Sequence, residues 1–291
     1  EEHRRLVLQA SWVDPTWMRN KLTMDAILEL GGLAPRTSFA MLSINEGAPG
    51  LYQVIERVDR LYLEANDLDK EGNVYKAVSH AADWGTRWDP MAGFEQKVNE
   101  ENPSEDLAFL REACADTPVT FADFESRVAS ILDLQGFMTW ILVQTYAMNR
   151  DTFTKNYYLH HSLQAPPGTA QDRFRVISWD ADATWGQNWN GNAVRPDSAD
   201  HVGTDELSPR LLGIPEYLAA YKASYREVLD GRLHASVLRA RAAAIHERIQ
   251  EAARADLASW QPALDFEAEY ARLREAIETR HRVMSAAIDG L

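Results

Sequence analysis

The residues best suited to chemistry begin with an aspartate and an asparagine five positions apart, Asp151 and Asn156. A phosphoryl-transfer loop uses this spacing, because a turn of the loop brings both side chains toward the same phosphate. The aspartate orients the attacking hydroxyl and accepts its proton, while the asparagine holds a metal ion. Asp and Asn also form ordinary turns and helix caps, so the spacing alone leaves a structural role for Asp151 open.

A second acidic pattern, Asp180 and Asp182, follows an expected strand over residues 174–179. Two carboxylates at positions i and i+2 of a strand end can reach one cation, and Mg²⁺ takes few protein carboxylates beside phosphate oxygens. The alternative is a strand-terminating turn, because Asp and Gly both favour turns. The order of loop, hairpin and strand-end Asp is that of a kinase. It favours Asp180 as the main metal ligand and Asp182 as an additional one.

The elements that must position these residues begin with a helix and short strands. An apolar-periodic stretch after Asp14-Pro15 predicts a helix that Asp14 caps and that ends at Gly31-Gly32. Two strands joined by a turn are predicted over residues 37–45 and 51–58. A third short strand is predicted over residues 73–78.

The second half of the chain is mainly helical. Its predicted elements are a helix over residues 103–115, two helices over 121–148 that meet near Gly136, a hairpin formed by 156–161 and 174–179, a loop over 187–206, and helices from Pro215 onward with an interruption at Trp260-Gln261-Pro262. Together with the first half, this order predicts an α+β fold. It is also the order of a protein kinase from its αC helix onward.

The composition narrows the class of protein. The net charge of −14 argues against a protein whose main task is to bind a nucleic-acid backbone, because phosphate binding needs clustered Lys and Arg. It fits a basic protein partner or a site that concentrates cations, although solubility is the plainer explanation. No apolar run approaches the roughly 20 residues that cross a bilayer, so no transmembrane segment is expected. Cys114 is the only cysteine, which excludes an intrachain disulfide.

Several short patches between residues 8 and 190, taken together and in order, resemble the CotH kinase family. The patches are DPTWMRNKL at 14–22, APR at 34–36, GLYQVIERVD at 50–59, VYKA at 74–77, NYYL at 156–159 and WDADATWG at 179–186. The resemblance implies an atypical protein-kinase-like α+β core with a C-terminal helical bundle. It also implies phosphoryl transfer from ATP, dependent on Mg²⁺ or Mn²⁺, to Ser or Thr of a protein substrate.

The resemblance assigns roles to the residues already singled out. Asp151 takes the catalytic role and Asn156 the second metal-binding role, while Asp180 is the main metal ligand and Asp182 an additional one. Glu56 is implied on the nucleotide side.

Asp59 is implied beside the nucleotide as well. For Glu56 and Asp59 the structural alternative is a strand-end salt bridge with Arg57 or Arg60. The resemblance also implies an upstream segment rich in Gly, Ser, Arg and Lys, whose lysine we expect to hold the nucleotide phosphates. The sequence opens at Glu1 and lacks this segment, unless it lies in a part that was removed.

Two lysines are possible substitutes for that lysine. We expect Lys76 to bind the nucleotide, with Lys21 as the other candidate. An ordinary surface or structural role is the alternative for both, and in that case transfer would be slow or absent.

The resemblance also implies how the chain is divided and where it acts. Residues 1–80 are expected to form a partial N-lobe-like region, 81–206 a catalytic C-lobe-like region and 207–291 a C-terminal helical region, together one CotH-type domain. A location in the spore coat, outside the cell or at its surface is implied. Two other functions remain open, namely a weakly active or inactive binding or surface-assembly module with the same fold, and a metal-dependent hydrolase that uses the same acids.

Overall fold

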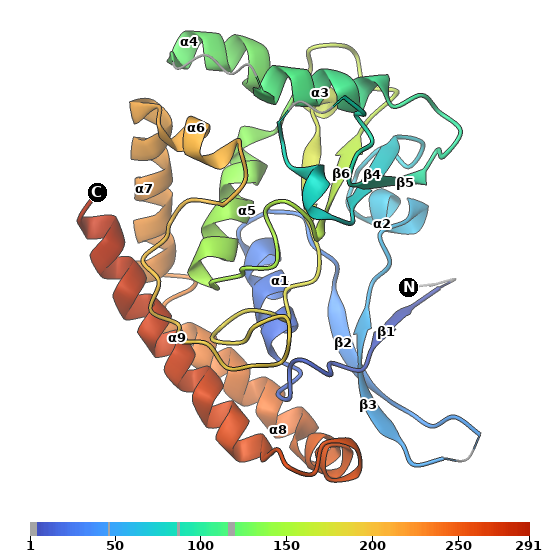
Figure 1. Cartoon of the computed structure of the whole chain (residues 1–291), viewed down its shortest axis with the longest axis vertical. Coiled ribbons are helices and arrows are strands. Elements are labelled where there is room, and N and C mark those ends of the chain that lie inside the picture. Colours follow the sequence, from blue (N-terminus) through green and yellow to red (C-terminus); the bar gives the residue numbers. More distant parts are fainter. Residues whose placement is uncertain (1–4, 46, 86–87, 116–119) are drawn as a thin grey trace.

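The computed structural model describes residues 5–45, 47–85, 88–115 and 120–291. Its helices and two antiparallel sheets confirm the predicted α+β class. The sheets occupy one side of the molecule, and the long C-terminal helices α8 and α9 run along the other side and beneath it (Figure 1). Among the described residues, none of the helices combines the length and the apolar character that crossing a membrane requires.

The first sheet has the strand order β1-β3-β2. Its strands are β1 (Val7–Gln9), β2 (Thr37–Leu42) and β3 (Gly50–Ile55). Both neighbours of β3 are antiparallel to it, so that Ile55 pairs with Thr37 on one side and with Val7 on the other. The two predicted strands are therefore present but shorter than expected, and β1 was not predicted.

The second sheet has the strand order β5-β4-β6-β7 and carries the candidate site at one end. Its strands are β4 (Asn73–Ala77), β5 (Phe94–Val98), β6 (Tyr157–His161) and β7 (Arg175–Ser178). The antiparallel pair β6–β7 confirms the predicted hairpin. Lys76 of β4 pairs with Tyr158 of β6, so that a single strand, β6, lies between this lysine and β7.

Helices supply the rest of the fold. They are α1 (Arg19–Glu29), α2 (Arg60–Ala65), α3 (Glu105–Ala115), α4 (Phe121–Phe124), α5 (Leu134–Tyr146), α6 (Ser208–Leu212), α7 (Pro215–Asp230), α8 (Ala235–Trp260) and α9 (Phe266–Asp289). The predicted interruption after Trp260 separates α8 from α9, and a further break between α7 and α8 was not predicted. The buried face of α5 contributes Phe137 and Trp140 to the main core, where Trp140 packs against Tyr157 of β6.

The predicted start of the first helix is wrong. Helix α1 begins at Arg19, and Asp14 is not its N-cap residue. The carboxylate of Asp14 instead accepts hydrogen bonds from the backbone N–H of Thr16 (3.0 Å) and of Arg19 (2.8 Å). Trp17 has a φ of +58°, a left-handed conformation that interrupts any helix at this point.

The predicted junction near Gly136 is also wrong. The α4 segment continues as a π-helical turn over Glu125–Ala129, and α5 begins only at Leu134. Asp133 is the N-cap residue of α5 and accepts a hydrogen bond from the N–H of Gly136 (3.2 Å). Gly136 therefore lies in the first turn of α5, because a capping aspartate three residues upstream, rather than the glycine, fixes the boundary.

A buried arginine attaches helix α9 to the end of α5. Arg280 is 0% exposed, and its guanidinium donates to the backbone oxygens of Tyr146 (2.9 Å) and Thr145 (2.9 Å) at the end of α5. The same group donates to the backbone oxygens of Pro196 (3.3 Å) and Ser198. These bonds satisfy helix-terminal carbonyls that have no partner within α5. They tie the last helix to the segment from which the candidate site emerges.

Candidate functional site

The loop that follows α5 holds the carboxylate of Asp151 from two sides. The Nδ2 of Asn156 donates to the Oδ2 of Asp151 (3.0 Å) and to its backbone oxygen (2.7 Å). The Nζ of Lys155 lies 2.8 Å from the Oδ1 of Asp151. Asn156 has a φ of +58° and Phe153 a φ of +72°, so the loop is kept in a strained conformation. The predicted pair Asp151 and Asn156 is therefore brought into direct contact.

A buried chain of hydrogen bonds connects this loop to the strand that precedes Asp180. The Oδ1 of Asn149 accepts from the N–H of Asp151 (3.0 Å), and its Nδ2 donates to the Oε1 of Gln144 (2.9 Å). The Nε2 of Gln144 donates in turn to the hydroxyl of Ser178 on β7 (2.8 Å). Gln144, Asn149 and Ser178 are all buried. The two loops that carry the candidate residues are thus held in a fixed relation.

Helix α1 positions the loop that begins at Asp180. The Oδ1 of Asn20 accepts from the N–H of Ala181 (2.9 Å), and its Nδ2 donates to the Oε1 of Gln53 on β3 (2.5 Å). Thr184 closes the turn by donating its hydroxyl to the backbone oxygen of Ala181 (2.8 Å). Asp180 itself has a φ of +55°, which the surrounding bonds must maintain.

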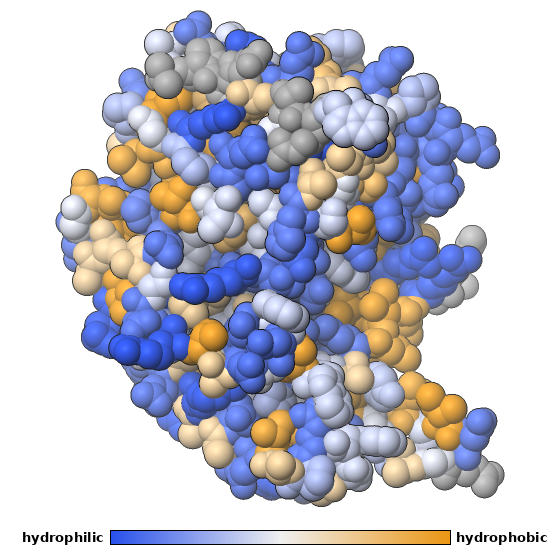
Figure 2. Space-filling view, in the orientation of Figure 1, coloured by the Kyte–Doolittle hydropathy of each residue, from blue (hydrophilic) through white to orange (hydrophobic). Residues whose placement is uncertain are grey.

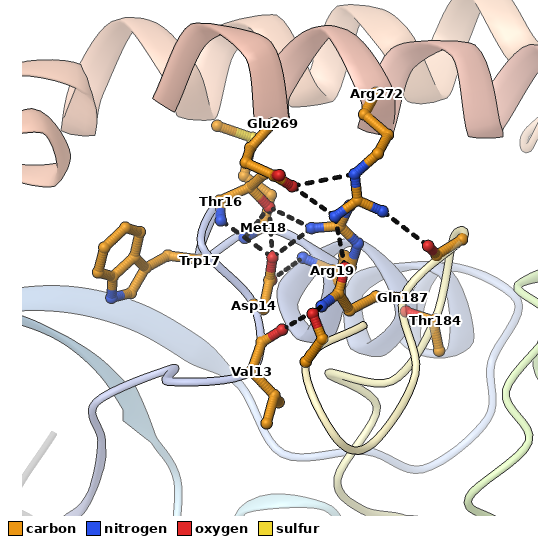
Figure 3. A network of polar contacts seen from close by, with 12 residues as sticks. Val13, Asp14, Thr16, Trp17, Met18, Arg19, Thr184, Gln187, Glu269 and Arg272 are labelled. Carbon is orange, nitrogen blue, oxygen red and sulfur yellow. Dashed lines mark hydrogen bonds and ion pairs between the residues drawn. The ribbon is translucent and has the colours of Figure 1, made fainter. Parts of the chain in front are cut away.

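The far end of this loop is fixed by residues from both ends of the chain (Figure 3). The guanidinium of Arg272 on α9 donates to the backbone oxygen of Gly186 (2.7 Å) and pairs with Gln187 and Glu269. Gln187 donates to the backbone oxygen of Val13 (2.6 Å). The sticks of Figure 3 show Arg19, paired with Asp14, lying between these groups and the start of α1.

Burial and neighbouring carboxylates raise the pKa values of two aspartates in the site. Burial raises the pKa of Asp180, and the charge of Asp151 raises it further, against the opposing effects of Lys76 and Lys155. Burial and then the charge of Asp180 raise the pKa of Asp182 to about 8. These shifts show that Asp151, Asp180 and Asp182 lie close enough for their charges to interact. Lys76 and Lys155 offset the rise in the pKa of Asp180 only in part.

The donor atoms present fit a divalent cation that also binds phosphate. Across the described part of the chain, no three His, Cys, Asp or Glu side chains are arranged to hold a metal ion. Mg²⁺ is seldom held by a cage of protein ligands alone, and one or two carboxylates plus substrate phosphates are its usual partners. Asp180 and the Oδ1 of Asn156 would supply protein ligands. The buried Oε1 of Gln9, next to Asp182, has no hydrogen-bond partner among the described residues.

The structure distinguishes the two candidate lysines. The ammonium of Lys76 lies over the ring of Trp179 (5.2 Å), and the charge of Asp180 acts on it. Burial lowers the pKa of Lys76. The Nζ of Lys21 instead pairs with Asp25 of its own helix (2.9 Å). Of these two candidates, Lys76 is the one on which the charge of Asp180 acts.

Glu56 and Asp59 are engaged in structural contacts. The carboxylate of Glu56 binds the guanidinium of Arg36 in a bidentate pair, with 3.0 Å from Nε and 2.5 Å from Nη2. The expected alternative partners, Arg57 and Arg60, are not the ones it pairs with. Asp59 caps α2 by accepting from the N–H of Leu61 (3.0 Å). Neither carboxylate joins the group around Asp180.

A cavity of about 200 Å³ lies against Asp180. It is bounded by β1, α1 and β3, with Gln9, Asn20 and Ile55 among its lining residues and Trp179 beside Asp180. A small ligand in this cavity would contact Asp180.

Four contributors to the site were not found from the sequence. Lys155 lies four residues after Asp151 within the motif itself, and that spacing was the available signal. Gln9, Gln144 and Asn149 act through contacts with residues distant in the chain or through buried amides. Single-sequence patterns carry no signal for such contacts.

Comparisons with known proteins show which family the chain is part of. The family model described as "CotH kinase protein" matches residues 1–284. The chain is 30% identical over 256 residues to the inner spore coat protein H of Bacillus subtilis (strain 168), an alignment that covers 85% of this chain and 68% of that protein. A match over almost the whole chain shows more than a shared motif. The chain belongs to the CotH kinase protein family.

Proposed function

We propose that this protein transfers the γ-phosphoryl group of ATP to a Ser or Thr hydroxyl of a protein substrate. The observation that carries the proposal is the joining of Asp151, Asn156 and Asp180 at one end of the second sheet, where the charges of the two aspartates are close enough to interact. Such a group favours a divalent cation together with the phosphates that the cation binds. Membership of a family named for kinase activity supports the same reaction.

The reaction forms one bond and breaks another. The oxygen of the acceptor hydroxyl bonds to the γ-phosphorus, the bond between that phosphorus and the oxygen bridging to the β-phosphate breaks, and ADP leaves. The hydroxyl proton passes to Asp151, whose carboxylate is oriented by Asn156 and Lys155. Mg²⁺ or Mn²⁺, bound by Asp180 and Asn156 with Asp182 nearby, would neutralise charge on the phosphates. Lys76 is the residue that we assign to the nucleotide phosphates.

Asp180→Asn tests the proposal directly. We expect wild-type protein to be stabilised by ATP with Mg²⁺ or Mn²⁺ in a thermal-shift assay and to transfer radiolabel to a Ser- and Thr-containing acceptor protein. The variant should lose both, because the substitution removes the main charged ligand of the cation. The matched control is Asp67→Asn, at an exposed aspartate outside the site. Equal transfer by the wild type and Asp180→Asn would overturn the assignment.

A second function is favoured by a different observation. The relative from Bacillus subtilis is named as a spore coat protein, which supports a place for this chain in a spore coat and a role in assembly. A binding module that keeps the fold without transfer would bind its partner equally well with and without the nucleotide. Phosphate release without any acceptor protein would instead indicate a hydrolase.

We extend the proposal to the architecture. A kinase-like core would comprise an N-lobe-like region over residues 1–80 and a C-lobe-like region over 81–206, with 207–291 as a helical buttress. The contacts of α9 with the loop after Asp180 support treating the helical region as part of the same unit. Glu56 and Asp59 then shape the nucleotide side through Arg36 and α2 rather than by direct contact.

A further inference from the structure

A second pocket, of about 370 Å³, lies between the β2–β3 hairpin and the C-terminal end of α8. It opens beside Ala10, the residue after the Gln9 that binds Asp182. Most of its lining is apolar, with three aromatic residues, and the polar exceptions include Asp256 and Gln261. The hairpin projects from the body near the lower end of α8, and Figure 2 shows hydrophobic surface on this projection. The lining of this pocket shares no residue with the candidate site described above.

Asp256 is the unusual member of this lining. It is 9% exposed, and its Oδ2 accepts the backbone N–H of Leu51 (2.7 Å). Within the described residues no Lys, Arg or His forms an ion pair with it. Burial raises the pKa of Asp256, and only the bond from Leu51 acts against that shift. A carboxylate so placed has a strong electrostatic preference for a cation that enters the pocket.

Two exposed tryptophans flank this carboxylate. Trp12 is 67% exposed and Trp260 is 58% exposed, and both line the pocket. Trp260 lies four residues after Asp256 on α8 and therefore on the same face of the helix. The Nε2 of Gln261 donates to the backbone oxygen of Trp12 (3.2 Å), which holds the N-terminal segment against the end of α8. Indole rings that share a pocket with a carboxylate provide the kind of lining that attracts an organic cation.

We propose that this pocket binds a Lys or Arg side chain of a basic partner polypeptide. The cationic head would pair with Asp256, and its methylene stem would pack between the indoles of Trp12 and Trp260. The net charge of −14 favours a basic partner over an acidic or neutral one. The proposal does not rest on phosphoryl transfer, since the binding needs neither nucleotide nor metal. If transfer also holds, the pocket anchors the acceptor protein at the strand that contacts Asp182.

The binding can be followed through the two indoles. The probes are capped pentapeptides with one central Lys or Arg between glycines, added to ¹⁵N-labelled protein without nucleotide or divalent metal. The indole N–H signals are assigned from the spectra of Trp12→Phe and Trp260→Phe. We expect both signals to shift with the Lys and Arg peptides and to remain in place with peptides that carry norleucine or citrulline instead.

The carboxylate is tested by Asp256→Asn, which can keep the bond from Leu51 while it removes the charge. We expect the affinity for the Lys peptide to fall roughly tenfold, as for the loss of a charge-assisted hydrogen bond. Glu251→Gln is the matched control, because it removes the same charge from an exposed position on the same helix, and it should bind as wild type does.

Other results would overturn the proposal. Equal shifts with the norleucine peptide would indicate a purely apolar pocket. Shifts with N-acetylglucosamine but none with lysine would indicate a saccharide site. Shifts on dilution of the protein alone, and none with peptide, would indicate a second copy of this chain as the occupant. The comparison of lysine with norleucine uses wild-type protein, so it stands even if Asp256→Asn fails to fold.

Discussion

Both carboxylate oxygens of Asp151 are occupied, one by Asn156 and the other by Lys155. This fixes the plane of the carboxylate before any substrate arrives, which is the form of positioning that phosphoryl transfer requires. Within the part of the chain that the structure describes, no hydrogen bond or ion pair holds the carboxylate of Asp180 in this way, and its pKa is raised by burial and by Asp151. The two aspartates thus differ in their surroundings, and the proposed function gives them different tasks, with Asp151 accepting a proton and Asp180 holding a cation.

Asp151→Asn should separate these tasks. The variant keeps the size of the side chain but cannot accept the hydroxyl proton, so transfer should fall by about 10²–10⁴-fold. Stabilisation by ATP and Mg²⁺ should persist, because Asp180 still holds the cation. Radiolabel transfer and thermal shift measured on one preparation give both quantities. A variant that lost nucleotide binding together with transfer would place Asp151 among the metal ligands instead.

At the scale of single residues, the sequence predicted which residue types form the site better than it predicted which residues they contact. Asp151 and Asn156 share one loop, so their spacing anticipated their contact. Glu56 pairs with Arg36, which is 20 residues away and on the neighbouring strand region, and this could not be read from local spacing. The predicted Asp14 cap was wrong for a related reason, because the carboxylate of Asp14 binds Thr16 and the side chain of Arg19 ahead of the helix.

At the scale of elements, α3 is joined to the second sheet through Asp106. Its carboxylate accepts from the hydroxyl of Tyr75 (2.6 Å) and from the Nδ2 of Asn73 (3.0 Å) on β4, and it lies 2.8 Å from the Nδ1 of His161 on β6. The ring of His161 also stacks on Phe174 (4.3 Å). This cluster holds the helix against two strands.

The Asp106 cluster makes stability depend on pH. Burial by itself would lower the pKa of His161, but the hydrogen bond and the charge of Asp106 raise it above its usual value. The folded state then binds the proton more tightly than the unfolded state. The contribution is complete below about pH 6.5 and is lost as the pH rises through the folded-state pKa, with a slope of at most about 1.4 kcal/mol per pH unit.

His161→Gln should remove this dependence. In urea unfolding between pH 6 and pH 9, the stability difference between wild type and variant should be largest at the acid end and should shrink as the pH rises. The difference curve cancels the titration of every group that the substitution does not touch. A difference that stayed constant with pH would show that the pKa of His161 is the same in the folded and unfolded states, and one that shrank toward acid pH would show that the folded state disfavours the proton.

The elements that were predicted are those with strong local patterns. The helices after Pro215 are long and periodic, and the β6–β7 hairpin is bounded by clear turn residues. Strand β1 has three residues, and β5 carries the polar run Glu95-Gln96-Lys97, so neither has the alternating apolar pattern of a strand. Both are strands because a neighbouring strand offers its backbone groups, which is tertiary context.

At the scale of the whole molecule, the candidate site depends on segments from both ends of the chain. Arg272 of α9 contacts Gly186 and Gln187, and Gln187 contacts Val13 (Figure 3). Arg280 attaches the same helix to the end of α5. The helical tail is thus part of the support of the site rather than a separate appendage.

Arg272→Leu should therefore weaken the site from a distance. Losing the bonds to Gly186 and Gln187 frees the end of the loop that begins at Asp180, and we expect the unfolding free energy to fall by about 1–3 kcal/mol. The stabilisation by ATP and Mg²⁺ should fall as well. Arg282→Leu, at an exposed position on the same helix, is the control and should change neither quantity. Unchanged nucleotide stabilisation in Arg272→Leu would show that the loop keeps its shape without α9.

The position of Arg272 and Arg280 in the last helix has a consequence for synthesis. A ribosome releases the loops of Asp151 and Asp180 well before it releases the arginines that brace them. During that interval the nascent chain holds the acidic residues without their scaffold, so the site matures only after α9 has emerged. The loop that begins at Asp180 therefore gains its contacts with Arg272 only after α9 has left the ribosome.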